Sequence, residues 1–139
     1  MVTHLGPSGS GQVAKSCNQT ITSATMHAVA EALTLAGRAG LYQEALRLAL
    51  LGGSARCAVL ENHAKRMLAR GFAPAGFRAE LMRKDLRAAE RTAEAHGAPH
   101  PSASRVRETL DALVASGRGA MDTTALILVL EDAAGPPAA

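Results

Sequence analysis

The stretch GPSGSGQVAKSCNQ (residues 6–19) places three closely spaced glycines directly before a helical pattern that carries Lys15. Glycine adopts unusual backbone angles at low steric cost, so a glycine cluster can bring a ligand to the positive end of the following helix. Residues 11–39 contain no proline, and small or apolar side chains recur three or four positions apart. This spacing predicts one long helix opened by a glycine hinge. The stripe consists of Val13, Cys17, Ile21, Ala24, Ala28, Ala32 and Leu35.

The rest of the chain also has a helical pattern, interrupted by glycine and proline. With no Trp, one Tyr and two Phe, the core must be built from Ala, Leu, Val and Met, which favours closely packed helices. The fold class we predict is all-α, a helical bundle with one long N-terminal helix. The further helices are expected at 42–51, 54–69 with Ser54 as N-cap, 77–96, 101–116 and 122–131 with Asp122 as N-cap.

Composition limits the function classes. At 139 residues the chain is expected to form one domain, with residues 11–132 as its body and residues 133–139 as a loose tail. Lys and Arg are spread along the sequence and aromatic residues are scarce, which argues against nucleic-acid binding. No apolar run approaches the roughly 18 residues of a membrane span, and the first residues do not resemble a signal peptide. We therefore expect a cytoplasmic protein.

A phosphate loop is one interpretation of the glycine segment. Residues 9–16 (GSGQVAKS) nearly fit GxxxxGK[ST], but Ala14 stands where that motif needs glycine to wrap the phosphates. The dinucleotide fingerprint GxGxxG fits no better, because the order here is GxxGxG. A phosphate-loop nucleotide-binding protein remains an alternative that the all-helical remainder disfavours.

Lys15 is the candidate for chemistry on the long helix. Lys15, Asn18 and Thr22 share one helical face, with Gln19 beside them. The charged form of a lysine near a helix N-terminus is electrostatically disfavoured, which favours a role in proton transfer. On spacing alone, the alternative is a solvated lysine with two surface amides.

The histidines do not predict a metal site. Gly97 and Pro99 separate His96 from His100, so no helix presents both histidines on one face. His27 and Glu31 do share a face, and we interpret them as a structural polar pair inside an apolar helix, with catalysis as the lesser alternative.

The opening segment resembles the signature GxxGxGxxxK, followed within a turn by Asn, that begins the C-terminal domain of β-hydroxyacid dehydrogenases. This is the group of 3-hydroxyisobutyrate dehydrogenase and tartronate semialdehyde reductase. The resemblance continues in family order over almost the whole chain, and it implies the helical fold of 6-phosphogluconate dehydrogenase-like C-terminal domains. The matching segments are AEALTLAGRAG (30–40), GGSA (52–55), GFRAELMRKDLRAA (76–89) and DTTALILVLE (122–131).

The resemblance also implies residue roles. Lys15 would exchange a proton with the substrate oxygen while hydride passes to or from a nicotinamide, and Asn18 or Gln19 would orient it. Lys84 would reach the cofactor, and Phe77 and Asp85 would line the closed site. From the residues alone, Phe77 would be assigned to the core, Lys84 to a solvated charge and Asp85 to a surface carboxylate.

The resemblance implies an NAD- or NADP-dependent enzyme acting on a β-hydroxyacid or its semialdehyde, nearest the tartronate semialdehyde (2-hydroxy-3-oxopropionate) reductases. Related imine reductases replace the lysine, so Lys15 favours hydroxyacid substrates. The family's N-terminal Rossmann domain is missing here, and VTHL (residues 2–5), within the segment 1–10, would end its last strand. We expect an inactive isolated chain that pairs through its long helix as a homodimer or higher oligomer. The alternative is a non-catalytic helical dimerisation module.

Overall fold

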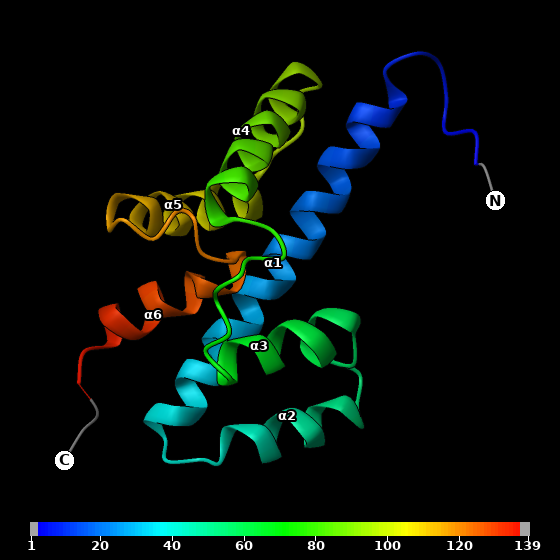
Figure 1. Cartoon of the computed structure of the whole chain (residues 1–139). Helices are drawn as coiled ribbons and strands as arrows, with labels where there is room; N and C mark the ends of the chain where they lie inside the picture. The colour runs from blue at the N-terminus through cyan, green and yellow to red at the C-terminus, as the bar shows by residue number, and fades with distance from the viewer. Residues whose placement is uncertain (1–2, 137–139) are drawn as a thin grey trace.

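A computed structural model describes residues 3–136 of the chain. Within that range the fold is all-α, as predicted, and the long helix α1 passes diagonally through the molecule with the other helices packed along it (Figure 1). The helices are α1 (Ser10–Arg38), α2 (Gln43–Leu51), α3 (Ala64–Leu68), α4 (Ala79–Ala95), α5 (Pro101–Ala115) and α6 (Leu126–Ala134), with a π-helical turn η1 (Val59–His63) and a 3₁₀ turn η2 (Thr123–Ala125).

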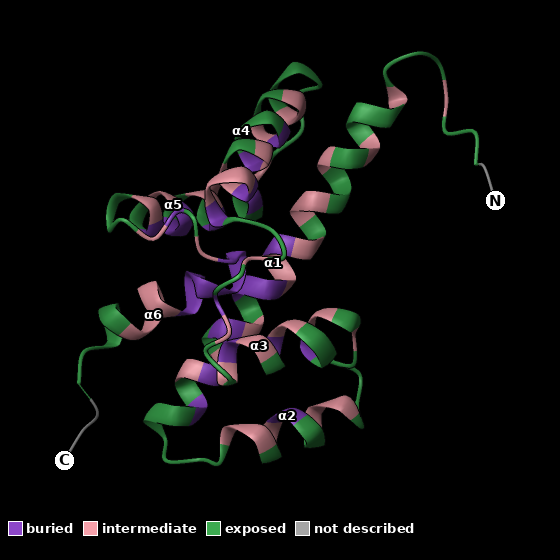
Figure 2. Cartoon of the chain, in the orientation of Figure 1, coloured by how far each residue is buried: buried purple, intermediate pink, exposed green. Residues whose placement is uncertain are grey.

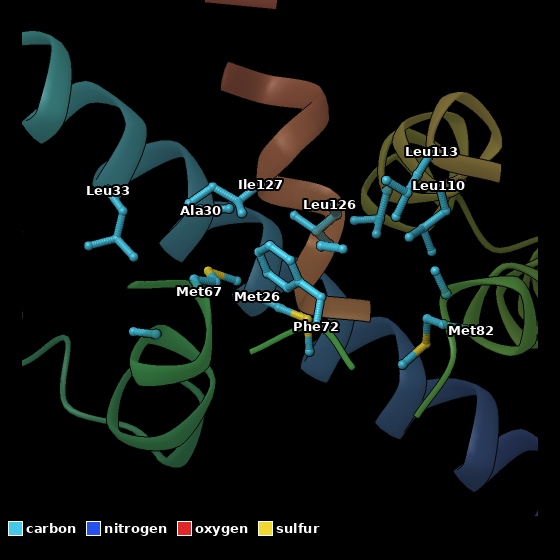
Figure 3. Close-up of a cluster of buried hydrophobic side chains, with 14 of the residues drawn as sticks. Met26, Ala30, Leu33, Met67, Phe72, Met82, Leu110, Leu113, Leu126 and Ile127 are labelled. Carbon is cyan, nitrogen blue, oxygen red and sulfur yellow. The ribbon is translucent and has the colours of Figure 1, made fainter. Parts of the chain in front are cut away.

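The core lies against the C-terminal half of α1, where its buried residues run from Ser23 to Ala36. Met26, Ala30 and Leu33 are buried at helical spacing and share one apolar cluster with buried side chains of the later helices. Leu50 and Leu51 of α2 are only half-buried and pack against its edge. Figure 3 shows Phe72 and Met67 beside Met26, with Leu110 and Leu113 of α5 to the right of Leu126 of α6. Two phenylalanines and one tyrosine leave Leu, Met and Ala to fill this space, as the composition indicated.

The stripe that the sequence suggested for α1 is wrong as a description of its buried face. Ile21 is 67% exposed and Leu35 is 70% exposed, and Val13 and Cys17 are also exposed. Several faces of α1 are apolar, and the packing covers the face of Met26 and Leu33 instead of the predicted stripe. At about 1.5 Å per residue the 29 residues of α1 span about 43 Å, and none before Ser23 is buried. Figure 2 shows the N-terminal half of α1 alternating between exposed and half-buried residues.

The helix expected from Ser54 begins later than predicted. Residues 52–55 form turns, and helical structure starts near Ala58 with the π-helical turn η1 before α3. Cys57, and not Ser54, contacts the start of the helical segment: its Sγ accepts a hydrogen bond from the backbone N–H of Leu60 at 3.4 Å. The other predicted helices begin and end within about two residues of the observed bounds, apart from the last.

Asp122 is the N-cap that the sequence predicted. Its Oδ1 accepts hydrogen bonds from the N–H and the hydroxyl of Thr124, at 3.0 and 2.7 Å, and caps η2, which leads directly into α6. Helix α6 continues to Ala134, so residues 133–134 belong to the helix and not to the predicted tail.

The two ends of the chain are only partly described. Residues 137–139 of the predicted tail and residues 1–2 lie outside the described residues, and Thr3 to Leu5 form neither helix nor strand here. None of the helices within residues 3–136 is long and apolar enough to cross a lipid bilayer.

Candidate active site

Lys15 and Asp85 meet where α1 and α4 lie side by side. The Nζ of Lys15 is 3.5 Å from Oδ1 of Asp85, and Nε2 of Gln19 donates a hydrogen bond to Oδ2 of the same carboxylate at 2.8 Å. The side chain of Asp85 is 13% exposed, whereas that of Lys15 is 60% exposed. Asp85 is therefore held between two side chains one helical turn apart on α1, and Lys15 remains open to a reacting partner. We call these three residues the lysine cluster.

The two neighbouring amides occupy different positions. Gln19 contacts Asp85 directly, while Asn18 is exposed and its Nδ2 lies 3.4 Å from Oε1 of Gln19. A residue four positions after Lys15 stacks above it on the same face, and this places Gln19 in the cluster.

A cavity of about 480 Å³ begins at Gln19, within the usual size range of ligand sites. Thr22 and Met26 continue the face of α1 into it, and Phe77 and Met82 supply much of its apolar wall. Its other polar residues come from η1, α3 and the segment before α6. The lining consists of Gln19, Thr22, Met26, Asn62, His63, Arg66, Gly76, Phe77, Met82, Asp122 and Thr123.

Asp122 fixes the loop that carries Phe77. Its Oδ2 accepts the backbone N–H groups of Gly76 and Phe77, at 2.9 and 3.2 Å, and also pairs with Nη1 of Arg66. Burial of Asp122 favours its neutral form, but the hydrogen bonds from Thr124, Phe77 and Gly76 outweigh burial and lower the pKa of Asp122. The backbone N–H and the hydroxyl of Thr123 both donate to the carbonyl of Phe77 at 2.9 Å.

Gly76 allows this network to close. A Cβ at that position would lie 3.2 Å from Nη1 of Arg66 and 3.4 Å from Oδ2 of Asp122. A side chain there would require the guanidinium of Arg66 to shift by a few tenths of an ångström.

The structure brings together most of the residues that the sequence singled out. Lys15, Gln19 and Asp85 form the lysine cluster, and Phe77, 39% exposed, lines the adjoining cavity. Asn18 lies at the edge of the cluster. Lys84 is exposed on α4 next to Asp85 and makes no hydrogen bond or ion pair with the cluster in the described part of the chain.

Sequence reasoning missed the cavity wall formed by Asn62, His63 and Arg66. These residues are separated from Lys15 by more than forty positions, and no spacing rule connects them. Among the polar residues on that side of the cavity, only Asp122 was indicated by a local sequence pattern, as an N-cap.

The predicted polar pair on α1 is present and lies outside the cavity. The Nδ1 of His27 is 3.2 Å from Oε1 of Glu31, and its Nε2 is 2.9 Å from the hydroxyl of Thr109 on α5. Burial lowers the pKa of His27, opposed by Glu31 and assisted by Arg105. This contact ties α1 to α5.

Residues 9–130 match the family model described as "NAD-binding of NADP-dependent 3-hydroxyisobutyrate dehydrogenase". The chain belongs to this family. The match confirms the resemblance to β-hydroxyacid dehydrogenases, the all-α C-terminal domain and a cofactor of the NAD or NADP type.

Sequence and structural similarity to individual members of the family supports this assignment. The 2-hydroxy-3-oxopropionate reductase of Escherichia coli K12 is 38% identical over 130 residues, covering 94% of this chain and 44% of that protein. The 2-(hydroxymethyl)glutarate dehydrogenase of Eubacterium barkeri is 28% identical, covering 96% and 44%. The structure of 3-hydroxyisobutyrate dehydrogenase from Mycobacterium tuberculosis with L-serine has a TM-score of 0.82 at 30% identity, covering 92% and 46%. The chain thus spans less than half the length of these relatives.

Proposed function

We propose that this chain is the helical catalytic domain of an NAD- or NADP-dependent β-hydroxyacid dehydrogenase, in which Lys15 exchanges a proton with the substrate oxygen. The observation that carries the proposal is the lysine cluster. It holds a solvent-facing ammonium group against a half-buried carboxylate at the edge of a cavity of ligand size. Membership of the family supplies the type of reaction.

The chemistry requires an acid at this position. Hydride, which the nicotinamide supplies when bound, leaves negative charge on the former carbonyl oxygen of the substrate, and that oxygen must receive a proton. The ammonium group of Lys15 donates it, and in the reverse direction the neutral amine removes a proton from the hydroxyl. Asp85 keeps Nζ in place, and Gln19 keeps the carboxylate from turning away.

The exposed residues beside the cluster suit a cofactor. Lys84 presents a solvated ammonium group on the same helix as Asp85, which suits contact with a phosphate of the dinucleotide. Phe77 offers an apolar surface at the cavity wall. We assign cofactor contacts to Lys84, Phe77 and Asp85, and substrate contacts to Gln19 and Asn18.

The substrate we propose is a β-hydroxyacid or its semialdehyde. The relative at 38% identity carries the name 2-hydroxy-3-oxopropionate reductase, which makes that compound the first to test. The enzyme is expected in the cytoplasm.

A Rossmann domain is the partner that completes the site. The relatives are more than twice as long as the aligned region, and α1 leaves Val13 and Ile21 exposed at the end that carries Lys15. We also propose a homodimer or a higher oligomer built on α1. The competing function is a dimerisation module without turnover, which the same exposed side chains would serve.

A fusion protein tests the proposal. The chain is joined behind the nucleotide-binding half of the E. coli reductase, and oxidation of NADH and NADPH is followed at 340 nm, roughly the absorbance maximum of both, with 2-hydroxy-3-oxopropionate. We expect turnover by the fusion and none by the chain alone. Lys15→Met should abolish turnover, whereas Lys65→Met, at an exposed lysine of α3, should leave it unchanged.

Two results would count against the proposal. A folded fusion that binds the cofactor but turns over no hydroxyacid would support the dimerisation module. Turnover that survives Lys15→Met would remove Lys15 from the proton transfer.

A further inference from the structure

One wall of the cavity plays no part in the proposed proton transfer, and it is rich in hydrogen-bond donors. Asn62 and His63 come from η1, and Arg66 comes from α3. Gln19 belongs both to the lysine cluster and to this cavity, so a ligand that reaches Lys15 can extend to the donors. We call these three residues the donor wall.

His63 is the unusual member of the donor wall. Its Nδ1 is buried and has no hydrogen-bond partner among the described residues. Unsatisfied buried polar atoms destabilise a fold, and one retained at a cavity requires an explanation. The torsion that turns an imidazole ring is broad, so rotation of the ring can present this nitrogen to a bound molecule.

The local backbone around His63 is also unusual, and it is held in place. His63 ends the π-helical turn η1, and such turns occur frequently at functional sites. The guanidinium of Arg47, 3% exposed, donates from Nη1 to the carbonyl of Glu61 within this turn at 3.1 Å. Arg47 is itself fixed by two hydrogen bonds to Glu44, at 2.8 and 2.6 Å. A buried charge therefore sets the register that puts His63 in the cavity wall.

The charges of Arg66 and Asp122 balance each other in the cavity lining, and the hydrogen-bond donors left over are what favours an anion. Asp122 is the one acidic residue in its lining, and its carboxylate already accepts from Arg66, Gly76, Phe77 and Thr124. Arg66 has five N–H donors, and Nη1 is the group directed to Asp122. Arg66 and His63 thus offer donors, and the acceptor capacity of the acid is largely occupied.

The volume exceeds what a small hydroxyacid needs. At roughly 30 Å³ per water, 480 Å³ holds on the order of fifteen waters, more than a three-carbon acid displaces. The donor wall lines one part of this volume, and Phe77, assigned above to the cofactor, lines another.

We propose that the donor wall binds a second carboxylate of the substrate, so that the preferred substrates are β-hydroxy dicarboxylic acids or their semialdehydes. His63 and Arg66 determine this specificity, and Asn62 assists them. The inference rests on the proposed function of Lys15, because it places the reacting end of the same molecule at the lysine cluster.

A binding experiment tests the subsite without turnover. Histidine side-chain nitrogens of the chain are observed by NMR during titration with glutarate and, at equal ionic strength, with pentanoate, which lacks the second carboxylate. We expect saturable shifts of the His63 signals with glutarate, and about tenfold weaker binding of pentanoate. His96→Gln, at an exposed histidine on the C-cap of α4, is the matched control and should not alter the glutarate response.

Variants of the donor wall separate a binding role from a structural one. His63→Leu should weaken glutarate binding about tenfold, while the melting temperature stays unchanged or rises, because the unpaired nitrogen is removed. A lower melting temperature with unchanged binding would make His63 structural and overturn the proposal. Arg66→Gln should also weaken binding of glutarate more than binding of pentanoate.

Kinetics of the fusion distinguish this proposal from the proposed function. The substrates are 2-(hydroxymethyl)glutarate and 2-(hydroxymethyl)pentanoate, which differ in the second carboxylate, and His63→Leu should lower the ratio of their kcat/KM values about tenfold. If the fusion turns over both substrates equally and glutarate causes no NMR shift of the His63 signals, the carboxylate subsite is overturned and the proposed dehydrogenase function stands. Glutarate binding at His63 in a fusion that oxidises neither acid supports the subsite and refutes the dehydrogenase.

Discussion

Gln19 and Asn18 carry the same functional group but differ in what they touch. Gln19 donates to Asp85 at 2.8 Å, and Asn18 reaches only the amide of Gln19. Gln19→Ala should therefore lower kcat of the fusion about tenfold by releasing Asp85, which is the loss expected for one hydrogen bond to a charged group. Asn18→Ala should change kcat by less than about twofold on the same scale. Equal losses from the two variants would show that Asn18 also acts at the site.

Gly76 can be tested by stability alone. Its missing side chain lets Arg66 approach Asp122, so Gly76→Ala should destabilise the chain by about 1 to 3 kcal/mol, as for an overpacked site. The matched control is Gly11→Ala in the first turn of α1, where a Cβ would meet nothing within 4 Å. That change should stabilise the helix by up to about 1 kcal/mol. Urea denaturation of both variants measures the difference, and equal effects would remove the steric argument.

The individual residues of the site differ in how far sequence could predict them. Helical spacing grouped Lys15 with Asn18 and Thr22 and placed Gln19 beside them, because all four lie on one helix, but it did not decide between the two amides. Asp85 and Phe77 were selected only through the family resemblance, since nothing local distinguishes them from a surface acid and a core ring. His63 and Arg66 were not found, because their relation to Lys15 depends on how η1 and α3 pack against α1.

Between elements, the contact of α1 with α5 makes stability depend on pH. Burial lowers the pKa of His27 in the folded chain, and its Nε2 lies 2.9 Å from Thr109. As pH falls below about 6.5, the imidazole of His27 is protonated in the unfolded chain before it is protonated in the folded chain. The free energy of unfolding therefore decreases from about pH 6.5 down to the lowered pKa of the folded state. The urea midpoint should drop between about pH 7 and pH 5, and His27→Gln should flatten that dependence. An unchanged slope in His27→Gln would assign the effect to other groups.

The helices themselves were predictable because their signals are local. Glycine, proline and the cap at Asp122 place most ends within about two residues of the observed bounds. The start of η1 was misplaced, since a serine that fits the cap pattern at residue 54 was outweighed by turns at residues 52–55. The buried face of α1 was also misjudged, because several of its faces are apolar and the tertiary packing decides which one is covered.

For the whole molecule, the uncovered apolar residues of α1 determine how the chain behaves alone. Ile21 and Leu35 are 67% and 70% exposed. Ile21 lies near the middle of α1, in the half that carries Lys15, and Leu35 lies near the C-terminal end of this helix, which is about 43 Å long at about 1.5 Å per residue. Large apolar side chains left on one helix favour association with another copy or a second domain. The isolated chain should therefore sediment as oligomers at micromolar concentration.

Charge substitution tests which end of α1 drives that association. Ile21→Glu and Leu35→Glu should each shift sedimentation velocity toward the monomer, because association would bury an unpaired carboxylate. Gln12→Glu adds the same charge to an exposed site on α1 and should leave the distribution unchanged.

If fusion to a nucleotide-binding half covers the Lys15 end, Ile21→Glu should impair turnover of the fusion, while Leu35→Glu should affect only its oligomeric state. A monomeric wild-type chain that unfolds cooperatively would contradict this account of α1, because its exposed side chains would then need no partner.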